Sequence, residues 1–398
     1  MKIRVGVFFG GKSVEHEVSV ISALQACRSL NTEKYEIIPI YITKNTEFYI
    51  GENIGKIEAY RNIPALLKES TRVIPVGNGN TVELLNYPMK KFGNNVAAVI
   101  DVALPVVHGT NVEDGALQGY LQTLGIPYAG CDVLSSALGM DKYAMKCVFA
   151  DNGIPVLPGT VINVKEYTSA QDAVLDMIES RTQYPVIVKP VNLGSSVGIR
   201  KAKDREALAD ALDYAFTFSI KVLVENAITD LKEINCSVLG DYEHAEASEC
   251  EEPVANDEIL SYQDKYVGGT KSSGGKSGMA SLKRKIPADI TPEMREEVRT
   301  LAVKAFRSLG CSGVSRIDFM LDQSTGKIYL NEINTIPGSL SFYLWEPVGV
   351  KYSELLDRMI NLAFKREREN KSISFSFDTN ILENASFGGS KGAKGGKM

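Results

Sequence analysis

The sequence reads Gly313-Val-Ser-Arg-Ile-Asp-Phe-Met-Leu321 and, after the turn Gln323-Ser-Thr-Gly326, Ile328-Tyr-Leu-Asn-Glu-Ile-Asn334. Polar and apolar residues alternate in both runs, which is typical of two strands joined as a β-hairpin. If the turn pairs residue 322 with residue 328, Asp318 faces Glu332 and Arg316 faces Asn334. Side chains alternate between the faces of a strand, so these four share one face. The opposite, apolar face then carries Ile317, Phe319, Leu321, Tyr329 and Ile333.

The polar face of this hairpin has the chemistry of a magnesium site that also binds phosphate. Two carboxylates and an amide supply hard oxygen donors, and Arg316 adds a fixed positive charge for an anion. A solvated polar face of a half-buried sheet explains the same residues, because an aspartate beside an arginine is ordinary there. The hairpin alone leaves both interpretations open.

A second segment, Lys189-Pro-Val-Asn-Leu-Gly-Ser-Ser-Val-Gly198, connects strands predicted at residues 184–190 and 197–201. Its small residues let backbone N–H groups approach a ligand closely, and Lys189 adds a point charge, so the loop suits phosphate oxygens. It is not a P-loop, because no G-x-x-x-x-G-K-[ST] pattern opens a helix here. A tight turn in which the glycines serve only backbone geometry is the alternative.

The N-terminal part predicts an α/β domain with a parallel sheet. An apolar strand at residues 2–9 ends in Gly10-Gly11 and is followed at once by helical periodicity. Further strands are predicted at residues 35–42 and 96–107, and the second of these is strongly apolar.

Three polar residues of this domain have a functional and a structural interpretation. Glu15 falls in the first turn of the helix, where capping alone explains an acid. His108 follows the buried strand, at the end where open α/β sheets bind ligands, although a structural histidine fits equally. Glu113 is explained by a helix cap.

Composition excludes several classes of function. The chain has 398 residues, enough for two or three domains, and 44 basic against 49 acidic side chains give a net charge of −5 without long blocks of either sign. We therefore expect no nucleic-acid or membrane partner, and neither a signal peptide nor a membrane span is visible. The 3 histidines are far apart and the 6 cysteines form no C-x-x-C pair, which argues against zinc and disulfides and for a reducing, cytoplasmic setting.

Taken together, the motifs resemble one family, the D-alanine:D-alanine ligases of the ATP-grasp superfamily. They occur in order as Gly10-Gly-Lys-Ser-Val-Glu15-His-Glu-Val-Ser19, His108-Gly-Thr-Asn-Val-Glu113-Asp-Gly-Ala-Leu-Gln118-Gly119, Met140-Asp-Lys142, Lys189 to Gly198, Asp264-Lys265-Tyr266, Arg316-Ile-Asp318 and Asn331-Glu332-Ile-Asn334-Thr-Ile-Pro-Gly338. The likeness covers about residues 1–366. It implies an α/β N-terminal domain with an open parallel sheet, followed by a two-domain ATP-grasp fold of α+β type.

The resemblance divides the chain into an N-terminal substrate-binding domain (1–130), a central ATP-grasp subdomain (131–220) and a C-terminal subdomain with the magnesium and acyl-transfer site (221–366). The remaining tail, 367–398, is expected to be partly disordered because it is rich in Gly, Ser and Lys. ATP is expected between the second and third domains, and a homodimer is implied.

The resemblance also implies a role for each motif residue. ATP would be bound by Lys142, Lys189, Ser196, Glu225, Glu233 and Asn331, and two Mg²⁺ ions, which Mn²⁺ can replace, by Asp318, Glu332 and Asn334. Catalytic roles are implied for Glu15, Ser195, Tyr266, Arg316 and Gly338. Glu15 would hold the ammonium of the first D-alanine, and Arg316 with the Gly338 N–H would stabilise an oxyanion. Substrate contacts are implied for His108, Lys265, Tyr343 and Leu344, with Lys265 at the acceptor carboxylate.

The implied reaction has two steps. A D-alanine carboxylate attacks the γ-phosphoryl group of ATP to give an acyl phosphate, and the amine of the second amino acid then expels phosphate. Water must be excluded from the acyl phosphate, so a closing lid is expected, and the Gly- and Ser-rich residues 264–281 are the candidate.

The match departs from the family pattern after Gly338. Straight counting puts Tyr343 where an acceptor-binding serine is usual, with the only tryptophan, Trp345, two positions on. Both aromatics also fit as plain core residues. Three hypotheses follow: a D-alanine:D-alanine ligase for peptidoglycan precursors, which Tyr266 favours; the same chemistry with another acceptor such as D-serine; and a nucleotide-binding regulatory relative without turnover.

Overall fold

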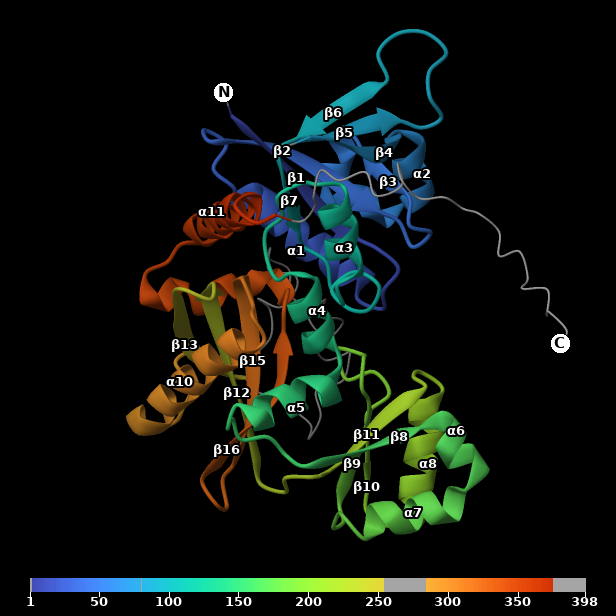
Figure 1. Cartoon of the computed structure of the whole chain (residues 1–398), viewed down its shortest axis with the longest axis vertical. Helices are drawn as coiled ribbons and strands as arrows, with labels where there is room; N and C mark the ends of the chain where they lie inside the picture. Colours follow the sequence, from blue (N-terminus) through green and yellow to red (C-terminus); the bar gives the residue numbers. More distant parts are fainter. Residues whose placement is uncertain (1, 80, 254–283, 375–398) are drawn as a thin grey trace, which may run out of the picture.

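The computed structural model describes residues 2–79, 81–253 and 284–374, which form three β-sheets with helices packed on them (Figure 1). A sheet containing parallel strands is followed by two antiparallel sheets. This mixed α/β architecture confirms the predicted fold class.

The N-terminal unit is built on a seven-stranded sheet in the order β6-β5-β4-β3-β2-β1-β7. Its strands are β1 (Ile3–Gly10), β2 (Tyr35–Ile42), β3 (Phe48–Ile50), β4 (Thr71–Asn78), β5 (Thr81–Asn86), β6 (Val96–Ile100) and β7 (Val102–Pro105). Its helices are α1 (His16–Ser29), α2 (Ile63–Lys68) and α3 (Ala116–Thr123), with 3₁₀ turns η1 (Glu52–Gly55) and η2 (Ile57–Arg61).

This first sheet is only partly parallel, whereas the sequence pattern predicted parallel strands. β1 pairs in parallel with β2 and β7, but the pairings from β2 through β6 are antiparallel. The single strand predicted at residues 96–107 is split at Asp101, whose carboxylate accepts hydrogen bonds from the Arg4 backbone N–H (2.8 Å) and Nε (3.0 Å). β6 and β7 lie at opposite edges of the sheet although only Asp101 separates them, so the sheet curls until its edges meet.

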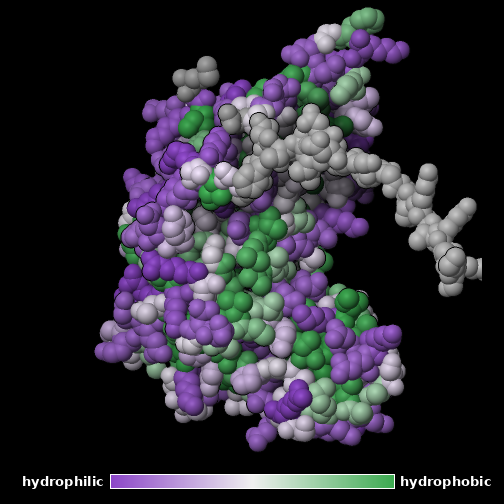
Figure 2. All heavy atoms as spheres, in the orientation of Figure 1, coloured by the Kyte–Doolittle hydropathy of each residue, from purple (hydrophilic) through white to green (hydrophobic). Residues whose placement is uncertain are grey.

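The central lobe carries a four-stranded sheet in the order β10-β9-β11-β8. It consists of β8 (Gly159–Asn163), β9 (Val186–Pro190), β10 (Arg200–Ala202) and β11 (Lys221–Asn226), covered by α6 (Val164–Ser169), α7 (Gln171–Glu179) and α8 (Arg205–Phe216). β11 pairs with β8 and β9, so this sheet extends to Asn226. Figure 2 shows the lobe at the lower right, set off from the upper part by an indentation of the outline.

The C-terminal sheet has the order β14-β13-β12-β15-β16. Its strands are β12 (Leu231–Gly240), β13 (Ala245–Pro253), β14 (Arg284–Lys285), β15 (Gly313–Asp322) and β16 (Lys327–Asn334). The helices that follow in the chain are α10 (Pro292–Ser308) and α11 (Tyr352–Lys371), with 3₁₀ turns η4 (Gly338–Leu344) and η5 (Glu346–Val348). Helices α4 (Val133–Met140) and α5 (Lys142–Asp151) precede the central lobe in sequence, but Met145 and Phe149 of α5 are buried in the same core as this sheet.

The β15–β16 hairpin has the predicted pairing at its polar end and a different one at its turn. Arg316 pairs with Asn334 and Asp318 with Glu332, as expected. A bulge then shifts the register, and the turn pairs residue 322 with 327 instead of 328. Ile328 and Leu330 consequently lie in the core, so the assignment of Tyr329 to the apolar face was wrong.

The last described helix, α11, packs the C-terminal part of the chain against the N-terminal unit. α11 buries the predicted face, including Leu355, Leu356 and Met359, in the core that contains β1 and α1. Trp345 belongs to the same core and donates its Nε1–H to Ser237 Oγ at 3.0 Å, which confirms the core interpretation of this residue. α11 runs to Lys371, and the residues after 374 lie outside the described ranges.

Within the described ranges, every helix is too short or too polar to cross a bilayer.

Gly310 and Gly313 offer a matched test of the packing between β15 and the N-terminal unit. Both have positive φ, +68° and +79°, but a Cβ on Gly313 would lie 2.8 Å from the Gly130 Cα, whereas one on Gly310 meets nothing within 4 Å. Gly310→Ala should cost about 1 kcal/mol through left-handed strain alone. Gly313→Ala should lower the thermal unfolding midpoint clearly further, and equal midpoints would contradict the predicted backbone clash.

Candidate active site

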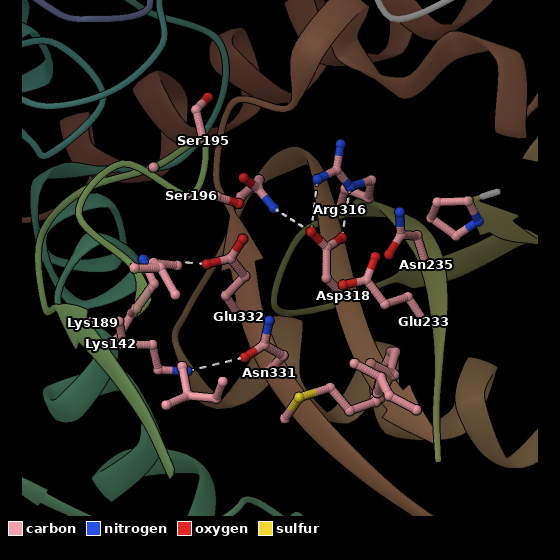
Figure 3. Close-up of a pocket in the computed structure, with 18 of the residues that line it drawn as sticks. Lys142, Lys189, Ser195, Ser196, Glu233, Asn235, Arg316, Asp318, Asn331 and Glu332 are labelled. Atoms are coloured by element: carbon pink, nitrogen blue, oxygen red, sulfur yellow. Dashed lines mark hydrogen bonds and ion pairs between the residues drawn. The ribbon is translucent and has the colours of Figure 1, made fainter. Parts of the chain in front are cut away.

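A cavity of about 650 Å³ lies where the central lobe, the C-terminal sheet and loops of the N-terminal unit meet. Figure 3 shows Lys142 and Lys189 on one side, Glu233 and Asn235 on the other, and the carboxylates of β15 and β16 between them. The cavity therefore brings together side chains that are far apart in the sequence.

The four residues predicted to share the hairpin's polar face all line this cavity. Arg316 donates from Nε (2.6 Å) and Nη2 (2.7 Å) to the two carboxylate oxygens of Asp318, and Asn334 Nδ2 donates to the same group at 3.1 Å. Glu332 lies 3.2 Å from Lys142 Nζ. Both carboxylates thus face the cavity with a cation beside them.

These oxygen donors fit a hard divalent cation such as Mg²⁺. The set is two carboxylates and one amide, Asp318, Glu332 and Asn334, which leaves room for phosphate oxygens in the coordination shell. In the described part of the chain no three His, Cys, Asp or Glu side chains gather as a metal cluster. The donor set therefore suits a metal that arrives with a phosphate ligand better than a metal held by protein alone.

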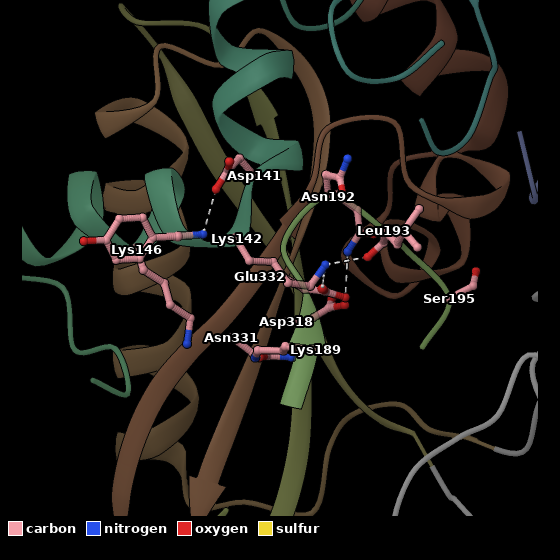
Figure 4. Close-up of polar contacts among 12 residues, drawn as sticks. Asp141, Lys142, Lys146, Lys189, Asn192, Leu193, Ser195, Asp318, Asn331 and Glu332 are labelled. Atoms are coloured by element: carbon pink, nitrogen blue, oxygen red, sulfur yellow. Dashed lines mark hydrogen bonds and ion pairs between the residues drawn. The ribbon is translucent and has the colours of Figure 1, made fainter. Parts of the chain in front are cut away.

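The residues predicted to bind phosphate lie beside this carboxylate face. Lys142, the first residue of α5, donates to the Leu193 carbonyl at 2.7 Å (Figure 4), and Lys189 of β9 donates to Asn331 Oδ1 at 3.3 Å. The loop between β9 and β10 forms no helix, as predicted. Its Ser195 and Ser196 have left-handed φ of 53° and 58°, a strained conformation that clusters at ligand-binding loops.

Lys146 is a functional candidate that the sequence reasoning missed. It lies one helical turn after Lys142 and forms an ion pair with Glu225, whose other oxygen is 2.5 Å from Lys189 Nζ. Lys146 and Glu225 have side chains only 5% and 2% exposed. Burial, with the charge of Lys189, lowers the pKa of Lys146 to about 8. The i, i+4 spacing of two lysines on α5 was the available signal.

Glu225 holds its charge because of these two lysines. Burial alone would raise its pKa, but the charges of Lys189 and Lys146 outweigh burial and the pKa is lowered. Glu225, Glu233, Ser196 and Asn331 all line the cavity, as expected for a nucleotide site.

Glu15 also lines the cavity, and its carboxylate accepts a hydrogen bond from the Ser195 hydroxyl. It makes no side-chain capping bond to α1, so capping does not account for it. A Cβ on Gly109 or Gly194 would come within 2.7 Å or 2.8 Å of its carboxylate oxygen. Two glycines from separate loops therefore leave the space that this buried acid occupies.

His108 and Glu113 bind the loop that leads to Gly338. The His108 Nδ1–H donates to the Ile336 carbonyl at 2.8 Å, and Nε2 accepts from Ser22 Oγ at 2.9 Å. Glu113 accepts from the Ile336 N–H at 2.8 Å and from the Gly109 N–H at 2.9 Å. In the described contacts, His108 therefore fixes the position of this loop by hydrogen bonding. Glu113, which the sequence suggested as a helix cap, does the same.

The positions predicted after Gly338 are placed differently from Gly338 itself. Gly338 lines the cavity, but Tyr343 and Leu344 do not, and Leu344 is fully buried. The Tyr343 hydroxyl instead donates to Glu251 at 3.3 Å. In the described cavity, Tyr343 and Leu344 are therefore not in a position to contact a substrate directly. The predicted Lys265, Tyr266 and lid residues 264–281 lie outside the described ranges.

Comparison of the chain with known protein families identifies the family to which it belongs. The family model described as D-ala D-ala ligase N-terminus matches residues 4–131, and D-ala D-ala ligase C-terminus matches residues 148–361. The chain belongs to the D-alanine–D-alanine ligase family.

Relatives cover almost the whole chain. The D-alanine–D-alanine ligase of Acetivibrio thermocellus is 42% identical over 93% of this chain and 98% of its own length. The ligase of Thermosipho melanesiensis is 38% identical over 96% and 98%. Solved structures agree: the D-alanine-D-alanine ligase of Coxiella burnetii has a TM-score of 0.76 at 28% identity, covering 93% of this chain and 96% of that one. The VanG D-Ala:D-Ser ligase of Enterococcus faecalis has a TM-score of 0.74 at 32% identity, covering 91% and 100%.

The role of Lys146 in this ligase-family site can be tested by Lys146→Met. Without Lys146, Lys189 is the remaining cation beside Glu225. Glu225 should then bind Lys189 more tightly and make it less available to phosphate. We expect the KM for ATP to rise roughly 10- to 100-fold and the KM for the amino acid to change little. Lys146→Arg should recover part of the loss. Lys34→Met, which breaks an exposed pair with Asp357, is the matched control, and an unchanged KM for ATP in Lys146→Met would contradict the role.

The buried His108 predicts a pH dependence of stability. Burial lowers its pKa to about 4 from an ordinary 6.5. The unfolded chain binds a proton below pH 6.5 and the folded one only below pH 4, so stability is lost as pH falls through this window, by about 3 kcal/mol in total. Thermal unfolding of His108→Asn should show a flatter pH dependence from 6.5 to 4.5 than the unaltered chain. His244→Asn, at an exposed histidine, should not flatten it.

Proposed function

We propose that this chain is an ATP-dependent ligase that joins two D-alanine molecules into D-alanyl-D-alanine for peptidoglycan precursors. One observation carries the proposal: a single cavity is lined by Asp318, Glu332 and Arg316 on one wall and by Lys142 and Lys189 beside them. Family membership supplies the reaction class, an ADP-forming ligase with an ATP-grasp fold. Ligation needs an activated carboxylate, and these residues suit phosphoryl transfer from ATP.

The first step is transfer of the γ-phosphoryl group to the D-alanine carboxylate. The carboxylate oxygen attacks phosphorus, the bond to ADP breaks, and an acyl phosphate forms. Lys142 and Lys189 would offset the charge of the phosphates, and Glu225, Glu233, Ser196 and Asn331, which line the same cavity, would bind the nucleotide. Asp318, Glu332 and Asn334 would hold two Mg²⁺ or Mn²⁺ ions, which supply charge neutralisation when bound.

The second step is attack of the acceptor amine on the acyl carbon, with loss of phosphate and of a proton from nitrogen. Glu15, which accepts a hydrogen bond from Ser195, would bind the ammonium of the first D-alanine. Arg316 and the Gly338 N–H serve as oxyanion donors for the tetrahedral carbon. The predicted contacts of Tyr266 and Lys265 complete this assignment from the family resemblance.

D-Serine is a second candidate acceptor. The similarity to VanG, a D-Ala:D-Ser ligase, supports it, and the departure from the family pattern after Gly338 permits it. A regulatory relative without turnover is disfavoured, because the lysines, Arg316 and both carboxylates are all present in one cavity.

The cellular setting belongs to the same proposal. The family resemblance and the composition support a cytoplasmic homodimer with small-molecule substrates and without nucleic-acid or membrane partners. They also support three domains at residues 1–130, 131–220 and 221–366, followed by a partly disordered tail, with β11 moved to the central domain by its strand pairing.

The activity is tested by incubating the protein with ATP, Mg²⁺ and an equimolar mixture of D-alanine and D-serine, with products identified by mass. We expect D-alanine-dependent ADP release and a D-alanyl-D-alanine product. Arg316→Ala should lower kcat by roughly 10²–10³-fold, because an oxyanion donor is lost. Glu332→Gln should lower it further at limiting Mg²⁺, since one charged metal ligand is lost.

Matched controls separate this chemistry from general damage. Arg358→Ala and Glu246→Gln break an ion pair between α11 and β13, and the two side chains are 39% and 44% exposed. Both controls should remain near the unaltered rate. Near-unaltered rates for Arg316→Ala and Glu332→Gln would overturn the site assignment, and absence of any D-alanine-containing product would overturn the proposed function.

A further inference from the structure

A row of polar residues crosses the C-terminal sheet beyond the metal face. Glu251 of β13 pairs with Asn235 of β12, Asn235 pairs with Asp318 of β15, and Asp318 pairs with Glu332 of β16. Directly paired residues share a face of the sheet, and all four line the cavity. Glu332 and Asp318 belong to the phosphate end of the row, so Glu251 marks the end that the first reaction step does not use.

Glu251 is a buried acid held by three different segments. It is 2% exposed and accepts hydrogen bonds from Asn235 Nδ2 (2.9 Å), Arg284 Nη1 (3.0 Å) and the Tyr343 hydroxyl (3.3 Å). Burial, with the charge of Glu251, raises the pKa of Tyr343 to about 12, so its hydroxyl remains a donor at neutral pH. A buried acid with this many donors fixes the position of the groups around it.

Arg284 is the cation of this cluster. Its guanidinium carbon lies 3.9 Å from the centre of the Tyr343 ring, its side chain is only 12% exposed, and it lines the cavity. Stacking and the bond to Glu251 together fix the plane of the guanidinium, which is the arrangement that recognises a carboxylate in a defined orientation.

Four other cations that line the cavity have partners elsewhere. Lys142 and Lys189 lie at the phosphate end, and Arg316 is bonded through two nitrogens to Asp318. Lys232 donates to the Asp289 carbonyl at 2.9 Å. Among the described residues that line the cavity, Arg284 is the cation paired with Glu251, at the end of the row away from Lys142 and Lys189. The second amino acid of the proposed reaction attacks from the side away from the phosphates, which is this end of the row.

We propose that Arg284 binds the carboxylate of the accepting amino acid, and that Tyr343 and Glu251 act as positioning residues that hold its guanidinium. The assignment rests on the proposed ligase reaction. It gives Tyr343 an indirect role: the ring supports the arginine, and the hydroxyl points away to Glu251. An acceptor with a neutral amide in place of the carboxylate would then lose its charge-assisted contact with Arg284, which keeps its ion pair with Glu251.

The test compares two acceptors that differ only in this group. The full-length protein is given ATP, Mg²⁺, D-alanine as donor, and equal concentrations of D-alanine and D-alaninamide as acceptors, and both products are quantified by mass. The unaltered protein should favour D-alanyl-D-alanine over D-alanyl-D-alaninamide. Arg284→Met should reduce this preference roughly 10- to 100-fold while the KM for ATP stays unchanged.

Further variants keep the test decisive. Arg284→Lys keeps the charge without the planar fork, so its preference for D-alanine over D-alaninamide should lie between those of the unaltered protein and Arg284→Met. Tyr343→Leu should shift the preference in the same direction as Arg284→Met. If Arg284→Met fails to fold because Glu251 is left uncompensated, the double variant Glu251→Gln/Arg284→Met removes both charges and should show the same loss. Lys285→Met, at the neighbouring residue that pairs with Glu252, is the control and should leave the preference intact.

The outcomes separate the two proposals. If the unaltered protein makes neither product, the proposed function fails. If it makes the dipeptide but the Arg284 variants keep its product preference, or if they change the KM for ATP instead, the role of Arg284 is overturned.

Discussion

One extra residue in β16 determines which side chains face the cavity. Asp318 pairs with Glu332 and Phe319 with Leu330, so Asn331 has no direct partner across the hairpin. In a regular strand Asn331 and Glu332 would point to opposite faces. The bulge lets both line the cavity, where Asn331 meets Lys189 and Glu332 meets Lys142. Bulges commonly redirect side chains beside active sites, and here the bulge joins the C-terminal sheet to both lysines.

Three acids that line the cavity each lie beside at least one cation. Asp318 is paired with Arg316, Glu332 with Lys142, and Glu225 with two lysines. Burying a charge costs several kcal/mol, and a close partner offsets most of that cost. In the proposed reaction, phosphates that enter the cavity would compete with these carboxylates for the lysines, and the acids would act as internal counterions. Lys146 would matter for this exchange because Glu225 would keep a partner when Lys189 binds phosphate.

The sequence predicted the parts of the site that depend on local alternation or on motifs. The alternation in the hairpin placed Asp318 opposite Glu332 correctly, although the turn was predicted one residue off, because the bulge restored the register at the polar end. The partners of Glu225 and Glu113 could not be predicted, since Lys146 and Ile336 come from other segments and burial is a property of the fold. The curled first sheet escaped prediction for the same reason: the pairing of Asp101 with Arg4 spans 97 positions.

The start of η4 has a strained backbone that contacts with the N-terminal unit stabilise. The N-terminal unit therefore supports the candidate active site, although most of the cavity is lined by the central lobe and the C-terminal sheet. Ser339, Leu340 and Ser341 follow Gly338 with φ of 53°, 52° and 49°, a left-handed run that costs about 1–2 kcal/mol per residue. Contacts with α1 offset this cost, because the Ser339 N–H donates to Ser22 Oγ at 2.9 Å and its hydroxyl donates to Gln25 at 2.7 Å.

His108 and Glu113 hold the other side of the same loop through Ile336. The Gly338 N–H is therefore fixed only while the N-terminal unit is packed against the C-terminal sheet. Oxyanion stabilisation requires donors that are in place before the charge develops. In the proposed reaction, the folding of the N-terminal unit would therefore contribute to acyl transfer through the backbone that it holds, in addition to supplying the acid Glu15.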